Sequence, residues 1–161
     1  MNWDAIAAAA EILAAVGVII SLLYLGQQIR SQTLETRLTF ASELVNQLNL
    51  VYSDLSTDAQ LSELWVKGLQ DFAALSPSQR AQFSAFAGRL LRIVESVFHQ
   101  YRWGRIDDMV WGGIDTSVGD LYRYPGMKDW WGTRAHWFSK EFNAHMKTYA
   151  GDTSTPGLYG E

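Results

Sequence analysis

The chain begins with a long run of apolar residues. Residues 5–26, AIAAAAEILAAVGVIISLLYLG, contain a single charged side chain, Glu11. A helix of this length reaches about 33 Å, against about 30 Å for the hydrocarbon core of a bilayer. The many Ile, Leu and Val side chains contribute about −0.3 to −0.6 kcal/mol each to insertion, which outweighs a carboxylate costing at most about 3 kcal/mol. The pattern predicts a transmembrane helix, with a buried core helix or a cleaved signal peptide as the other interpretations.

Small and bulky side chains separate on opposite faces of this predicted helix. At about 100° per residue, the small side chains form one stripe that consists of Ala7, Ala10, Ala14, Gly17 and Ser21. Small residues let helix backbones approach closely in lipid, so this face is expected to contact another protomer or a different membrane protein. Glu11 lies at the edge of the stripe. It either lines the interior of an oligomer or, two turns from the helix start, reaches the headgroups or sits protonated at a helix interface.

Helical patterning continues beyond the predicted span. Apolar residues follow at spacings of three and four, which predicts one unbroken helix over residues 3–53 with a seam made of Leu34, Leu38, Ala41, Val45, Leu48 and Tyr52. The polar residues 53–58 predict a turn, and Thr57 with Gln60 predicts a capping box that starts a second helix. Ser76, Pro77 and Gln79 predict the start of a third helix.

The last third of the chain also has helical spacing. We expect a helix over residues 106–122, a turn at Pro125 and Gly126, and a further helix to about residue 150. The predicted fold is all-α: one transmembrane helix continues into a long helix that packs with three to four others as a cytoplasmic bundle. The expected divisions are a membrane helix with a short tail at residues 1–26, a helical domain at 27–150 and a flexible tail at 151–161.

Charge and composition narrow the function classes. Arg30 and Arg37 follow the predicted span and no basic side chain precedes it, so the positive-inside rule places the helical domain in the cytoplasm. The net charge is −4 and the 13 basic residues are scattered, so nucleic acid is not expected as a partner. The chain has no cysteine, which excludes disulfides, thiol catalysis and thiolate metal sites.

Aromatic residues are concentrated near the C-terminus. Five of the seven tryptophans follow residue 100: Trp103, Trp111, Trp130, Trp131 and Trp137. Core packing accounts for most of them, because a helical bundle of this size needs bulky filler. A membrane or subunit interface and a small-molecule site are the alternatives.

Two pairs of Glu and His residues have helical spacing. Glu95 precedes His99 by four residues, and Glu141 precedes His145 by four, so facing helices could bring together ligands for zinc or iron. Bundle di-iron sites instead use a spacing of three and further glutamates. Arg92 and Arg102 share the face of the first pair, which predicts that this pair is solvated. We therefore predict no cofactor, no metal site and no catalytic residue.

The end of the span carries a family resemblance. The residues IISLLYL at 19–25, followed by QIR at 28–30, resemble small uncharacterised bacterial proteins with one N-terminal transmembrane helix and a helical body. The resemblance covers about the first 35 residues and implies the bacterial inner membrane. It implies no activity or ligand.

Together these patterns predict a single-pass inner-membrane protein that acts as a scaffold or accessory subunit rather than an enzyme. Its expected partners are the lipid bilayer and either further copies of itself or another membrane protein. The first alternative is a homo-oligomeric pore lined by the small stripe, Glu11 and Gln28. The second is a membrane-tethered metalloenzyme that uses Glu95, His99, Glu141 and His145.

Overall fold

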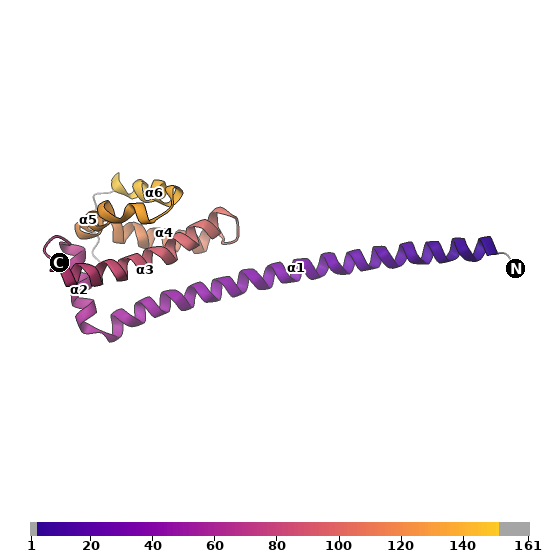
Figure 1. Cartoon of the computed structure of the whole chain (residues 1–161), viewed down its shortest axis with the longest axis horizontal. Helices are drawn as coiled ribbons and strands as arrows, with labels where there is room; N and C mark the ends of the chain where they lie inside the picture. The colour runs from indigo at the N-terminus through magenta and orange to yellow at the C-terminus, as the bar shows by residue number, and fades with distance from the viewer. Residues whose placement is uncertain (1–2, 152–161) are drawn as a thin grey trace. The chain divides into compact units, whose positions relative to one another are not determined.

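The chain folds into helices throughout the described part. The computed structural model describes residues 3–151, and within the first helix it describes the side chains of residues 3, 11, 16–32, 39, 43, 44 and 46 onward. The α-helices are α1 (Trp3–Thr57), α2 (Ala59–Gln70), α3 (Pro77–Arg102), α4 (Asp108–Tyr122), α5 (Pro125–Arg134) and α6 (Lys140–Met146) (Figure 1). Two 3₁₀ helices, η1 (Ala135–Trp137) and η2 (Lys147–Gly151), complete them. No strand occurs in residues 3–151, so the all-α prediction is confirmed.

Contacts divide the chain into two compact units. The first is Met1–Ala41 and the second is Ser42–Glu161, with α1 contributing to both. The tail predicted at 151–161 falls outside the described residues except for Gly151, which belongs to η2.

α1 is longer at its C-terminus than the sequence predicts. The expected turn at residues 53–58 is wrong, because the helix continues to Thr57. The hydroxyls of Ser56 and Thr57 donate to the carbonyl of Ser53, at 3.0 and 2.7 Å, so these polar residues bond within the helix instead of ending it. Asp58, not Thr57, is the N-cap of α2 and accepts from the Leu61 amide at 3.0 Å.

The end of α1 contributes to the core of the second unit. Leu44 and Val51 are buried, and Leu48 and Leu55 are partly buried against the same core. The predicted seam included Tyr52, whose side chain is 57% exposed. The seam is therefore shifted by one residue at this end of the helix, and the apolar positions follow spacings of four, three and four.

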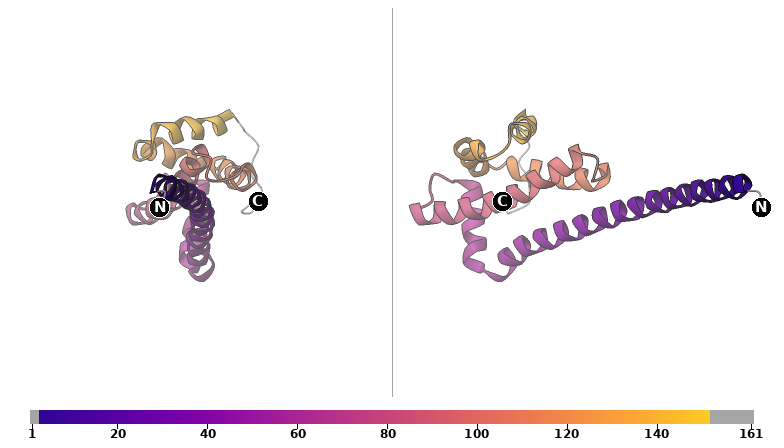
Figure 2. Two further views of the ribbon diagram at one scale, coloured as in Figure 1. Left: turned by 90° about the vertical axis from the view of Figure 1, so that its right-hand side faces the viewer. Right: turned by 45° about the vertical axis from the view of Figure 1, so that its right-hand side comes forward.

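α3 is the central helix of the second unit. The predicted capping box is confirmed: the Ser76 hydroxyl accepts from the Gln79 amide, and the Gln79 side chain accepts from the Ser76 amide. Ile93 and Glu95 are both buried although they are two residues apart and point to nearly opposite sides of the helix, so α3 is covered on several sides. Figure 2 shows α5 and α6 on the same side of α3.

A close crossing joins α2 to α5. A Cβ built on Gly126 would lie 1.9 Å from the carbonyl oxygen of Gly68 and 2.8 Å from that of Leu69. Only glycine permits this approach of two backbones. The turn predicted at Pro125 and Gly126 is instead the first turn of α5, since proline at the first helical position needs no amide partner.

The helix predicted to run to residue 150 is broken near its middle. After α5 the chain forms η1, and Ser139 caps α6 by accepting from the Phe142 amide at 3.3 Å. The Asn143 side chain donates to the carbonyls of Ala135, Phe138 and Ser139. The carbonyls of Ala135 and Ser139 also accept from the backbone amides of Phe138 and Asn143, so the Asn143 side chain adds a second bond at each of them and ties α6 to the segment before it.

Most of the late tryptophans are in the core. Trp111, Trp130 and Trp131 are buried, which confirms that packing accounts for them, whereas Trp103 and Trp137 are 64% and 42% exposed. Trp131 packs on Phe138 with 4.8 Å between the ring centroids. The core of the second unit is therefore largely aromatic.

Candidate functional site

α1 carries a long exposed apolar surface. From residue 16 to residue 29, the large apolar side chains are between 46% exposed, at Val16, and 70% exposed, at Leu23. We call residues 16–29 the apolar segment. Because residues 18–20 and 22–25 are consecutive large hydrophobics, these side chains point to every side of the helix except the face that carries Gly17 and Ser21. An uncovered apolar surface of this extent marks an interaction site.

The predicted small stripe is only partly within the described side chains. Those of Ala7, Ala10 and Ala14 lie outside them, as does much of the predicted span at residues 5–26. Glu11, Gly17, Ser21 and Gln28 are all exposed. The Ser21 hydroxyl donates to the Gly17 carbonyl at 2.8 Å, and a Cβ at Gly17 would meet nothing within 4 Å. The side chains at these two positions are therefore small and exposed.

Among the described residues, no helix combines the length and the apolar composition needed to cross a membrane.

The four candidate metal ligands are not brought together. Glu95 is only 7% exposed, so the prediction that it is solvated is wrong, whereas Glu141 is exposed. His99 contacts Ser139, and His145 contacts Asp115 on α4. Within the described part of the chain, no three His, Asp or Glu side chains are grouped so that they could hold a metal ion.

Glu95 and His99 instead form a polar network with Ser139, which sequence reasoning missed. The Glu95 carboxylate accepts from the Ser139 amide at 2.6 Å and from Arg92 Nη1 at 2.9 Å. His99 Nε2 lies 3.1 Å from the Ser139 hydroxyl. This resembles a nucleophile and a base, but the carboxylate bonds the Ser139 backbone rather than the imidazole, and the hydroxyl already caps α6. The network therefore joins α3 to the start of α6.

A second polar cluster links α4 to the C-terminal helices. His145 Nε2 lies 2.6 Å from Asp115 Oδ1 and 2.9 Å from the Tyr149 hydroxyl, which also donates to Asp115. The His145 ring stacks on Phe98 with 5.0 Å between the ring centroids, so it lies against the aromatic core. Burial, followed by the bond to Asp115, raises the pKa of Tyr149 well above its usual value. The four-residue spacing of His145 and Tyr149 was visible in the sequence, but nothing in it indicated Asp115.

No known protein family, curated protein or solved structure matches the chain. The functional argument therefore rests on the surfaces of the chain itself.

Proposed function

We propose that the chain is a single-pass protein of the bacterial inner membrane that associates through α1 and serves as a scaffold or accessory subunit. The observation that carries this proposal is the exposure of the apolar segment. Nine large side chains remain about half exposed there: Val16, Val18, Ile19, Ile20, Leu22, Leu23, Tyr24, Leu25 and Ile29. At about 1 kcal/mol each, covering them stabilises the chain by about 9 kcal/mol.

The distribution of these side chains favours lipid as the main cover. A partner helix buries one stripe of a helix, whereas large apolar side chains cover every side of the apolar segment except the face of Gly17 and Ser21. Lipid surrounds a helix completely, and a second helix needs only a narrow face on which to approach. Gly17 and Ser21 supply such a face. Arg30, which follows the apolar segment, supports placing the second unit in the cytoplasm.

Extraction of membranes with alkaline carbonate tests the anchoring. The double variant Ile19→Lys/Ile20→Lys introduces two charges into the apolar segment, which cost about 5 to 7 kcal/mol near the centre of a span. We expect the native chain to stay in the membrane pellet and this variant to move to the supernatant. Leu50→Lys/Tyr52→Lys is the matched control, because those α1 side chains are 63% and 57% exposed, close to the 57% and 60% of Ile19 and Ile20. Release of the native chain, or equal behaviour of both variants, would refute the proposal.

A pair of glycine variants tests the association. Gly17 and Gly26 both have open space at the Cβ position, and they lie on opposite faces of α1 because they are nine residues apart. Gly17→Ile should weaken self-association measured by light scattering in mild detergent, or reduce the recovery of a co-purifying partner. Gly26→Ile should leave both unchanged. A native chain that runs as a lone monomer with no partner contradicts the scaffold role.

A further inference from the structure

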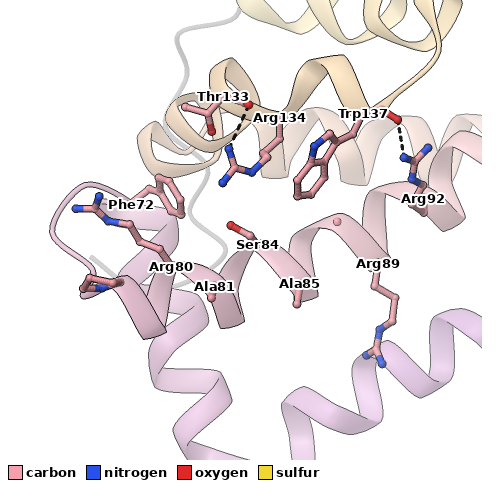
Figure 3. A pocket seen from close by; sticks show the side chains of 12 residues that line it. Phe72, Arg80, Ala81, Ser84, Ala85, Arg89, Arg92, Thr133, Arg134 and Trp137 are labelled. Atoms are coloured by element: carbon pink, nitrogen blue, oxygen red, sulfur yellow. Dashed lines mark hydrogen bonds between the residues drawn. The ribbon is translucent and has the colours of Figure 1, made fainter.

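An open cavity lies between α3 and α5 in the second unit (Figure 3). Its volume is about 730 Å³, which is in the range of small-molecule sites. Phe72, Pro77 and Trp137 supply much of its apolar wall, with small residues of α3 between them. The lining also contains four arginines and two hydroxyl side chains but no carboxylate. The cavity therefore combines an apolar wall with positively charged side chains.

Two of the four arginines are already neutralised. Arg89 points away from the cavity and pairs with Asp54 of α1. Arg92 pairs with Glu95 at 2.9 Å and donates to the Trp137 carbonyl. These two side chains therefore fix neighbouring elements and add little charge to the cavity.

Arg80 and Arg134 have no carboxylate partner among residues 3–151. Arg80 is held in place by backbone carbonyls, including that of Leu75, which accepts from its Nε at 2.9 Å. The Arg134 guanidinium lies over the Trp137 ring, 5.0 Å from the centroid. Both charges are held by the fold and left uncompensated, an arrangement suited to an anion.

Two polar atoms of the lining lack any hydrogen-bond partner in the described part of the chain. They are the hydroxyl of Ser84, a residue only 7% exposed, and Nε of Arg134. Ser84 lies beneath the Arg134 side chain (Figure 3). Buried polar groups are nearly always paired, because leaving one unpaired is costly. A ligand with acceptor oxygens satisfies both groups once the Arg134 side chain moves from above Ser84.

We infer that this cavity binds a small organic anion. Its phosphate or carboxylate group accepts from Arg134 and Ser84, with Arg80 at one end of the cavity. Its apolar body, a ring or a short chain, lies against Trp137 and the small residues of α3. This inference does not depend on the membrane proposal, because every residue in it belongs to the second unit.

Calorimetric titration of the full chain with 2-naphthyl phosphate tests the site. A chain that purifies without lipid is titrated in buffer. A chain held in a membrane is titrated in discs of zwitterionic lipid, and empty discs give the blank. Inorganic phosphate is the anionic half of this probe, and 2-naphthol is its aromatic half. We expect each half to bind at least about tenfold more weakly than the whole. Dihexanoyl phosphatidic acid identifies the source of the anion: tighter binding than the aryl phosphate indicates a lipid headgroup, and weaker binding a soluble metabolite.

Variants locate the binding. Arg134→Gln should weaken 2-naphthyl phosphate binding by about tenfold, Arg134→Lys by less, and Ser84→Ala by a few-fold. Arg105→Gln is the matched control, because Arg105 also lies over a tryptophan, Trp103 at 5.3 Å, but outside the cavity. The Arg105→Gln variant should bind 2-naphthyl phosphate with the affinity of the native chain.

Three results would overturn the inference. They are no binding of 2-naphthyl phosphate, equal binding of 2-naphthol or of inorganic phosphate, and equal losses for Arg134→Gln and Arg105→Gln.

Discussion

Removal of the Glu95 carboxylate should destabilise the second unit through lost hydrogen bonds rather than lost apolar packing. Glu95 is buried on α3 and accepts from the Ser139 amide at 2.6 Å, so it holds the start of α6 against the central helix. Glu95→Ala leaves the Ser139 amide without its acceptor and Arg92 without its carboxylate partner. The substitution removes two bonds but little apolar packing, so its cost reports on the network.

The magnitude follows from the two bonds. A hydrogen bond to a charged group contributes about 1.5 to 3 kcal/mol, and its loss leaves the Ser139 amide unpaired. The ion pair adds at most about 0.5 kcal/mol, because the Arg92 side chain is 55% exposed. We expect Glu95→Ala to lower the free energy of unfolding by about 2 to 4 kcal/mol. Glu95→Gln keeps an acceptor oxygen and should cost about 1 kcal/mol.

Urea unfolding of the full chain, followed by the fluorescence of the buried tryptophans, measures these changes. Glu141→Ala is the control, since Glu141 is exposed in the first turn of α6 and should contribute less than about 0.5 kcal/mol. Hydrogen exchange at the Ser139 amide should accelerate in Glu95→Ala and stay unchanged in the control. The reasoning is refuted if the Glu95→Ala midpoint lies within error of the Glu141→Ala midpoint.

Three further predictions concern a helix crossing, a tyrosine and a cap. Gly126→Ala should destabilise the chain by at least about 2 kcal/mol in urea unfolding, because its Cβ would overlap backbone of α2, whereas Gly132→Ala in the same helix meets nothing within 4 Å and should be neutral or stabilising. Equal effects would show that the crossing is not tight. Because the folded-state pKa of Tyr149 lies above the unfolded value of about 10, its contribution to stability is complete below about pH 10 and is lost as the pH rises toward the folded-state value. The native chain should therefore lose stability more steeply than Tyr149→Phe above about pH 10 in alkaline urea titrations, and parallel slopes would contradict this. Ser76→Ala should cost about 1 kcal/mol in thermal or urea unfolding, and no loss would mean that the capping box contributes nothing.

Local signals in the sequence predicted the start of α3 correctly. Ser76, Pro77 and Gln79 act on amides within one turn, so their effect does not depend on distant residues. The same local reasoning chose Thr57 over Asp58 as a cap, because two candidate caps stood side by side. It also interpreted Pro125 as ending a helix, although proline at the first position of a helix starts one equally well.

Long-range contacts could not be predicted in this way. The environment of Glu95 depends on Ser139, which lies 44 residues away and approaches only because the chain breaks between α5 and α6. On α3 alone, the neighbouring Arg92 indicated a solvated face. The anion cavity was missed for the same reason, since Ser84 and Arg134 belong to different helices and neither stands in a motif. The apolar run in α1 was visible because it is continuous.

The Asn143 side chain has a consequence for how the C-terminal part of the second unit moves. Its amide donates to the carbonyls of Ala135 and Phe138 before α6 and of Ser139 at its cap, at 2.8, 3.1 and 2.9 Å. A bend between two helices is commonly a hinge, but opening this one would break the Asn143 side-chain bonds to the residues before α6 at the same time. The bend between α5 and α6 is therefore rigid. η1 and α6 should detach from the core together, as one cooperative opening event, rather than swing about the residues that join them.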